Sequence, residues 1–270
     1  MTPASGHSWR RTTVPRSARA PLALALSALR ERPVADEVLL ELREDGVAVL
    51  SLNRPEALNI YDLAMRDGLI EAVTAVRDWP DARALLLRAN GRHFSAGADL
   101  SEFGTAEHPL EARRIRWDRD PWGPLWDLPC PTVVALHGIA VGSGLEMSLL
   151  CDVRLAAADT RVGLPETRLG MLPAAGGTQT LTRAVGSSAA LAPILLASTL
   201  TAADARERGI LHAVVEDVEA EALAVTRQLA QMGPRVASAA RRALHAAGDL
   251  PLDAGLAEEK RLAALAAPRR

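Results

Sequence analysis

The segment that decides the fold runs from residue 130 to residue 177 and reads CPTVVALHGIAVGSGLEMSLLCDVRLAAADTRVGLPETRLGMLPAAGG. Two of its carboxylates stand out, Glu146 and Glu166, each in an apolar setting. The glycine-flanked turn at 141–144 opens a predicted helix, and a helix start presents unpaired backbone N–H groups and the positive end of the helix dipole. One segment thus supplies an anion-binding site and two candidate acid/base groups, which predicts the activation of a carbonyl compound.

Strands and helices alternate on both sides of this segment. Apolar runs predict strands at 38–43, 47–52, 83–88, 132–136 and 152–157, the first two forming a hairpin. Helices are predicted at 62–79, with Asp62 as the N-cap, and from 143 to about 151. The last third is mostly helical, at 177–184, 187–196, 201–208, 217–231, 235–246 and 252–266, with a short strand at 211–215. This order predicts an α/β core with a helical tail.

The region 104–128 is polar and carries three tryptophans, at 117, 122 and 126. A helix is predicted in its first half, and the prolines at 121, 124 and 129 are expected to end the helical pattern. We expect this region to shape a substrate pocket.

Composition excludes several classes of function. The chain has 270 residues, of which 49 % are hydrophobic, and a net charge of −2. This balance provides no basic surface for nucleic acid, and no run of 18 apolar residues predicts a membrane span. Cys130 and Cys151 are the two cysteines and show no metal-ligand spacing, so we expect a reducing compartment, the cytoplasm.

Residues 1–36 differ from the rest and are set apart as an arm. They are rich in arginine and proline, and Glu31 is their first acidic residue. Three interpretations stay open: an organelle-targeting peptide, a disordered arm, or a start codon placed too far upstream. The remaining boundaries are a core at 37–200 and a helical C-terminal region at 201–270.

Several common motifs are absent. The stretch around Ser143 fails the Gly-x-Ser-x-Gly pattern of serine hydrolases, because Val141 and Leu145 occupy the glycine positions. A dinucleotide-binding pattern fails at Met147. The six histidines show no metal-ligand spacing, so no metal or redox cofactor is expected.

Taken singly, each glutamate allows a structural interpretation. Glu146 belongs to a helix that is apolar nearly all round, and a buried carboxylate is costly unless it is paired or functional. It could pair with Arg154 or Arg168 in the core, and Glu166 could be an ordinary loop acid. The functional hypothesis depends on the two glutamates flanking the same anion-binding helix start.

The chain resembles the enoyl-CoA hydratase/isomerase family, also called the crotonase superfamily. The resemblance rests on segments in the family's order, spread over roughly residues 38–215. They are LNRPEALN at 52–59, FSAGADL at 94–100, PTVVALHG at 131–138, GSGLE at 142–146, CD at 151–152, GLPE at 163–166 and LPAAGGTQ at 172–179.

The resemblance implies an α/β spiral of ββα turns and a helical C-terminal region that builds trimers, often paired into hexamers. It implies acyl-CoA thioesters as substrates, with the thioester oxygen held by the backbone N–H groups of Ala98 and Ser143. It matches Glu146 and Glu166 to the two catalytic glutamates of the hydratases. Family members usually have glycine where this chain has Ser143, and serine would be strained there if the position required φ > 0.

The implied coenzyme A contacts are less specific. The residues expected to bind the substrate are Arg54, Arg92, Ser95, Ala96, Asp99, Leu100 and Gly142. Glu56 stands where many relatives have a basic residue, and the chain stops before the last helix that relatives usually have.

The sequence therefore predicts an enoyl-CoA hydratase, a hydro-lyase that adds water syn to a 2-enoyl-CoA and gives the 3-hydroxyacyl-CoA. The rivals are another crotonase reaction, such as double-bond isomerisation or decarboxylation, and a non-catalytic acyl-CoA-binding protein. The expected partners are the thioester and further copies of the chain, as a homotrimer or hexamer, without nucleic acid or membrane.

Overall fold

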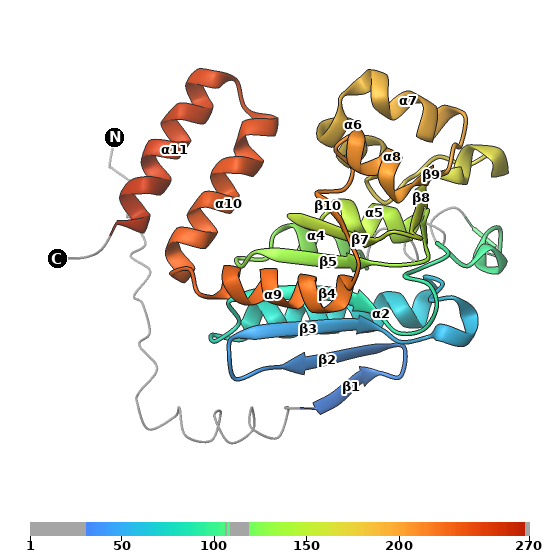
Figure 1. Cartoon of the computed structure of the whole chain (residues 1–270), viewed down its shortest axis with the longest axis horizontal. Helices are drawn as coiled ribbons and strands as arrows, with labels where there is room; N and C mark the ends of the chain where they lie inside the picture. The colour runs from blue at the N-terminus through green and yellow to red at the C-terminus, as the bar shows by residue number, and fades with distance from the viewer. Residues whose placement is uncertain (1–30, 106, 109–118, 268–270) are drawn as a thin grey trace, which may run out of the picture.

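The computed structural model describes residues 31–105, 107–108 and 119–267. Within them, seven strands form the main sheet, in the order β1-β2-β3-β4-β5-β7-β10 (Figure 1). Their bounds are Glu31–Ala35 (β1), Val38–Leu42 (β2), Val47–Leu52 (β3), Ala84–Ala89 (β4), Thr132–Leu136 (β5), Val153–Ala157 (β7) and Ala213–Val215 (β10). A smaller sheet pairs β6 (Ile139–Val141), β8 (Arg161–Gly163) and β9 (Leu200–Thr201).

The main sheet is parallel from β3 to β10 and antiparallel at its β1–β2–β3 edge. Successive residues of β3 face opposite sides: Leu50 belongs to one buried cluster and Val49 to the other. Both faces of the central strands are therefore covered, which explains why β3 and β4 read as continuous apolar runs.

Helices cover the two faces of this sheet. α2 (Leu63–Asp78) packs on β1, β2 and β3, and α9 (Val218–Ala230) packs across β4 and β5. The other helices are α4 (Trp122–Trp126), α5 (Ser143–Leu149), α6 (Gly177–Val185), α7 (Ser187–Leu195), α8 (Ala202–Glu207), α10 (Pro234–Asp249) and α11 (Leu252–Ala266). Short 3-10 turns occupy Pro55–Ala57, Leu100–Glu102 and Pro165–Leu169. No helix among the described residues is long and apolar enough to cross a membrane.

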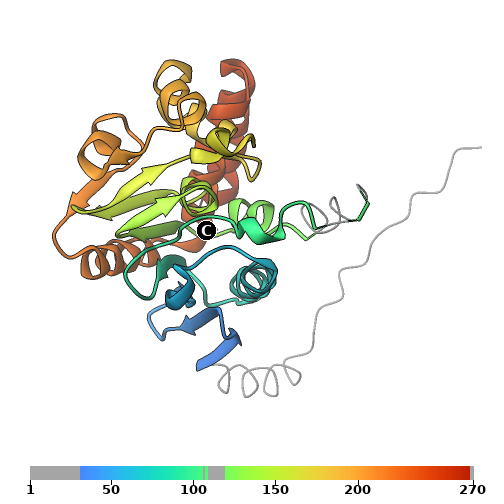
Figure 2. The same ribbon diagram turned by 90° about the vertical axis from the view of Figure 1, so that its right-hand side faces the viewer.

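The C-terminal helices α10 and α11 pack on each other as a hairpin at one end of the molecule (Figure 1). Figure 2 views the molecule from the opposite end, with the hairpin at the back. One residue of α10, Arg241, reaches the core: its Nε donates to Asp152 at 2.7 Å, and its Nη1 donates to the carbonyls of Trp126 and Leu128, both at 2.7 Å. His245 stacks on Trp126, with ring centroids 3.8 Å apart. These contacts fasten the hairpin to the core.

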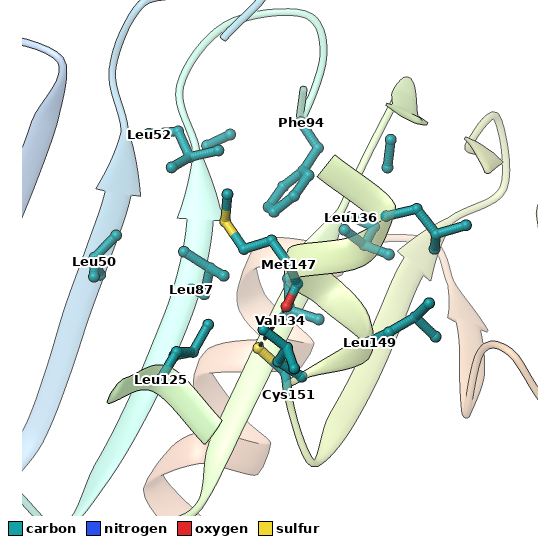
Figure 3. Close-up of a cluster of buried hydrophobic side chains, with 14 of the residues drawn as sticks. Leu50, Leu52, Leu87, Phe94, Leu125, Val134, Leu136, Met147, Leu149 and Cys151 are labelled. Atoms are coloured by element: carbon teal, nitrogen blue, oxygen red, sulfur yellow. Dashed lines mark hydrogen bonds between the residues drawn. The ribbon is translucent and has the colours of Figure 1, made fainter. Parts of the chain in front are cut away.

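The helix α5 lies in the middle of the main hydrophobic core. All seven of its residues are buried, and Met147 packs among Phe94, Leu87 and Leu136 (Figure 3). This arrangement confirms the buried helix predicted from the apolar sequence around Glu146. The packing of α5 in the core also holds the first residues of the helix in a defined position.

Most predicted elements are confirmed, including the Asp62 N-cap, whose side chain accepts a hydrogen bond from the Met65 N–H at 2.8 Å. The short strands β6, β8 and β9 were not predicted, and Pro124 lies inside α4 instead of ending the helical pattern. The predicted helix in the first half of 104–128 falls mainly on residues outside the described part of the chain. So do residues 1–30 of the arm, whereas residues 31–35 form β1. Cys130 and Cys151 are buried free thiols.

Candidate active site

The start of α5 is shaped by a glycine. Gly142 has φ 53° and ψ −129°, which favours glycine, and its carbonyl accepts the hydrogen bond of Glu146 N–H at 2.9 Å. Ser143, the next residue, does not have a positive φ. The backbone strain that a serine could have caused at this position is therefore absent.

The Glu146 side chain is 2 % exposed and lies in the first turn of α5. Its Oε1 accepts hydrogen bonds from the backbone N–H groups of Ala175 and Gly177, both at 2.9 Å. Gly177 begins α6, so the carboxylate lies at the positive end of a second helix. These donors orient the carboxylate and offset part of the cost of burying it.

Arg154, one of the proposed core partners of Glu146, has other contacts. Its Nε donates to the carbonyl of Ile210 at 2.6 Å and its Nη1 to the carbonyl of Cys151 at 2.8 Å. Arg154 thus links the end of α5 to the segment before β10. The hydrogen bonds to Oε1 of Glu146 come from backbone N–H groups and not from this guanidinium.

Glu166 approaches the same helix start from the turn Pro165–Leu169. Its Oε1 lies 3.2 Å from the position that a Cβ on Gly142 would occupy. The turn is closed by Met171, whose N–H donates to the backbone carbonyl of Glu166 at 3.0 Å, and by Gly170, which has φ 71°. A side chain at residue 142 would therefore crowd this carboxylate.

The loop that carries Ala98 lies against the start of α5. A Cβ on Gly97, which has φ 95°, would come within 3.7 Å of the Ser143 nitrogen. Neither the N–H of Ala98 nor that of Ser143 donates a hydrogen bond to any residue in the described ranges. The two N–H groups are available as donors on neighbouring segments.

One cavity of about 270 Å³ brings most of the predicted site together. Glu146, Glu166, Ala98 and Ser143 all line it. So do four of the residues expected to bind the substrate, Ala96, Asp99, Leu100 and Gly142. Two carboxylates and two available N–H donors thus share one space, an arrangement suited to acid/base chemistry next to a polarised carbonyl group.

A second cavity adjoins the first, and both are lined by Ala98 and Ser143. Its walls include Tyr61, Phe103 and Trp122, and the rings of Tyr61 and Trp122 lie 5.0 Å apart. Burial raises the pKa of Tyr61, which therefore stays neutral. Sequence reasoning singled out the tryptophan-bearing region but missed Tyr61, although it is the one tyrosine of the chain.

Three predicted substrate-binding residues lie elsewhere. Ser95 is fully buried behind the loop, and its hydroxyl donates to the carbonyl of Asn59 at 2.7 Å. Arg54 forms an ion pair with Asp62. Arg92 is exposed, and neither arginine lines either cavity. In the structure Ser95 has a packing position, and contacts of Ser95, Arg54 and Arg92 with a substrate stay predictions.

Comparison with known proteins gives one consistent answer. A sequence model of a family described as "Enoyl-CoA hydratase/isomerase" matches residues 42–266. The chain is 37 % identical over 231 residues to the 2,3-dehydroadipyl-CoA hydratase of Escherichia coli K12, covering 85 % of this chain and 90 % of that one. It is 36 % identical over 230 residues to a Mycobacterium bovis protein named "Probable enoyl-CoA hydratase", covering 84 % of this chain and 88 % of that one.

Solved structures agree with the sequence comparison. An enoyl-CoA hydratase from Bacillus anthracis superposes with a TM-score of 0.80 at 31 % identity, over 84 % of this chain and 90 % of that one. A Geobacillus kaustophilus enoyl-CoA hydratase subunit gives 0.80 at 30 % identity, over 86 % of this chain and 90 % of that one. The predicted α/β fold class with C-terminal helices is thereby confirmed.

Proposed function

The chain belongs to the enoyl-CoA hydratase/isomerase family, and from that premise we propose that it hydrates a 2-enoyl-CoA to the 3-hydroxyacyl-CoA by syn addition of water. The observation that carries the proposal is that Glu146 and Glu166 line the same cavity as Ala98 and Ser143. Isomerisation and other reactions in which one acid suffices do not require this pair.

In the proposed reaction the thioester oxygen sits between the N–H groups of Ala98 and Ser143. Hydrogen bonds to that oxygen make the β-carbon of the enoyl group electrophilic and let the α-carbon carry enolate character. One such donor typically contributes about 3–4 kcal/mol to transition-state stabilisation. Neither N–H is engaged with another described residue, which supports this role.

The two glutamates would then divide the acid/base work. One carboxylate takes a proton from the water molecule while the water oxygen bonds to the β-carbon. The other carboxyl group is positioned to deliver a proton to the α-carbon. Both groups lie on the same cavity, so both new bonds can form on one face of the alkene, which is the requirement for syn addition.

The two cavities define an orientation for the substrate, with the acyl chain in one and the pantetheine arm in the other. We assign the acyl chain to the cavity lined by Tyr61, Phe103 and Trp122, because its walls are mainly apolar and it opens from the two N–H donors. The pantetheine arm would pass Ala96 and Leu100 in the other cavity. Arg92 is exposed and could meet a coenzyme A phosphate outside it. No metal or redox cofactor is needed for these steps.

We further propose that copies of the chain associate through the C-terminal hairpin, as a trimer or a pair of trimers. The hairpin leaves large apolar side chains exposed, including Leu244 at 74 % and Leu252 at 79 %. Burying such side chains stabilises an interface by about 25 cal/mol per Å² of apolar area. Sedimentation analysis would test this, and a monomer at micromolar concentration would contradict it.

The function is tested by incubating the protein with crotonyl-CoA and, separately, with a 3-enoyl-CoA, and by following both products by chromatography. We expect 3-hydroxybutyryl-CoA from crotonyl-CoA, at a rate that depends on enzyme concentration. Conversion of the 3-enoyl ester to the 2-enoyl ester without hydration would favour isomerisation instead. Binding of both thioesters without product would favour a non-catalytic family member. A series of enoyl esters of graded length would then define the acyl cavity.

A further inference from the structure

Ser143 is mostly buried, but its hydroxyl faces the cavities of the candidate site. The residue is 8 % exposed and lines both cavities. Within the described ranges its hydroxyl makes no hydrogen bond to another residue, and its oxygen is open to the cavities. A hydroxyl that is open to a ligand cavity and makes no hydrogen bond within the protein can bond to a ligand there, so this hydroxyl is a candidate for such a contact.

The other buried serines near this site show the contrast. Ser148, on the same helix, donates to the carbonyl of Leu145 at 2.8 Å. Ser95 donates to the carbonyl of Asn59 and accepts the N–H of Gly97 at 3.2 Å. Both of these hydroxyls have partners within the protein. Ser143 differs from these two serines because its hydroxyl faces the cavities instead of a partner within the protein.

The position of Ser143 on the helix brings its hydroxyl close to the reacting atoms. Side chains of a helix tilt toward its N-terminus, and residues three apart share a face, so Ser143 lies on the Glu146 face of α5. The facing residue is Gly97, whose missing side chain leaves space beside the Ser143 nitrogen. An oxygen atom held by the Ser143 N–H in that space is also within reach of the Ser143 hydroxyl.

We propose that the Ser143 hydroxyl donates a third hydrogen bond to the thioester oxygen, alongside the N–H groups of Ala98 and Ser143. This inference rests on the proposed function and deepens it. A hydroxyl rotates freely enough to follow the oxygen as negative charge builds up on it, and side-chain hydroxyls serve as oxyanion donors. The side chain of Ser143 thus adds a third donor to the site.

The test combines a rate with a spectroscopic measurement on Ser143→Ala, which keeps the backbone N–H. With crotonyl-CoA we expect kcat/KM to fall by about 10- to 10²-fold, at or below the range for loss of one oxyanion donor. The vibrational measurement uses butyryl-CoA labelled with ¹³C at the thioester carbonyl, which is saturated and cannot be hydrated. Its bound C=O stretch should lie at higher frequency in the variant than in the wild type, because the carbonyl is less polarised. The melting temperature should not fall.

Ser148→Ala is the matched control. It removes a hydroxyl that is satisfied within the same helix, so it should lower the melting temperature and leave both the carbonyl frequency and kcat/KM close to those of the wild type.

The outcomes separate this inference from the proposed function. A wild type that hydrates crotonyl-CoA, with a Ser143→Ala variant of equal rate and equal carbonyl frequency, would overturn the third donor and leave the function intact. A slower variant with an unchanged carbonyl frequency would also overturn it, because the hydroxyl would then act on another group. A shifted frequency in a protein that hydrates no enoyl-CoA would support the donor and refute the function. Failure of the wild type to bind butyryl-CoA would refute both.

Discussion

The Oε1 atom of Glu146 lies 2.9 Å from the backbone nitrogen of Gly177, the first residue of α6. The start of one helix, α5, carries the carboxylate, and the start of a second helix orients it. A glycine is needed at residue 177, because a Cβ there would lie 2.8 Å from that same oxygen. The position of the acid therefore depends on a missing side chain 31 residues away.

This contact predicts the effect of Gly177→Ala. The added methyl group must displace the Glu146 carboxylate or the neighbouring Pro173, whose Cβ would be 3.0 Å away. We expect kcat for hydration to fall by about 10²-fold, the cost of misplacing a catalytic group by roughly 1 Å. Steady-state kinetics with crotonyl-CoA measures the effect.

Gly248→Ala is the control for the general effect of replacing a helical glycine. Gly248 lies in α10, and a Cβ there would meet nothing within 4 Å. Alanine should therefore stabilise the protein by about 0.5–1 kcal/mol and leave kcat unchanged. Wild-type activity in Gly177→Ala would show that the orientation of Glu146 tolerates the methyl group.

A second prediction concerns the attachment of the C-terminal hairpin. Arg241→Met would leave Asp152 without its guanidinium and the carbonyls of Trp126 and Leu128 without these donors. Removing one partner of a buried ion pair typically destabilises a protein by about 3–5 kcal/mol. Denaturant unfolding should show a loss of this size.

The neighbouring residue provides the comparison. Arg242 has a side chain that is 60 % exposed and lies 4.0 Å from Glu258. Arg242→Met should change the free energy of unfolding by no more than about 0.5 kcal/mol. Equal effects of the two substitutions would mean that Arg241 does not hold the hairpin in place.

The same cluster predicts a pH dependence of stability. Burial by itself would raise the pKa of Asp152, but hydrogen bonds from His245 and Arg241 and the charge of Arg241 outweigh it, so the pKa lies below its ordinary value of 3.8. The stability that Asp152 contributes is complete above that ordinary value and is lost as the pH falls through the lower, native pKa.

The difference in unfolding free energy between the wild type and Asp152→Asn should therefore be constant from about pH 7 to pH 5 and shrink below about pH 4. Urea titrations at several pH values measure it. A difference that stays constant down to pH 3 would show that the native pKa of Asp152 is not depressed.

The fold was largely predictable because its elements are long or fully buried. The α2 helix has an apolar face and an Asp62 cap, and β3 and β4 are covered on both faces. The strands β6, β8 and β9 have two or three residues, too few to show any periodicity. Pro124 is tolerated in α4 because it lies in the first turn of that helix, where N–H groups have no intrahelical partner.

The sequence predicted that Glu146, Glu166, Ala98 and Ser143 belong to one site, and the structure places all four on one cavity, whereas their roles stay predictions. The alternative, structural interpretation paired Glu146 with Arg154 or Arg168, whereas the N–H groups of Ala175 and Gly177 donate to its Oε1. Backbone donors cannot be read from residue types. Arg54, a predicted coenzyme A contact, forms an ion pair with Asp62, which the sequence did not indicate. Tyr61 joins the site through tertiary packing against Trp122, so its local sequence gave no signal.

The central claim is that Glu146 and Glu166 act on one substrate in one step, and a double-mutant comparison tests it most directly. The measurement is kcat for hydration of crotonyl-CoA by Glu146→Gln, Glu166→Gln and the double variant, each checked for wild-type melting behaviour. We expect each single substitution to lower kcat by about 10²–10⁴-fold. The double variant should be only slightly slower than the worse single variant, because groups that act as a unit are not additive. Near-normal turnover in either single variant, with the fold intact, would contradict the account.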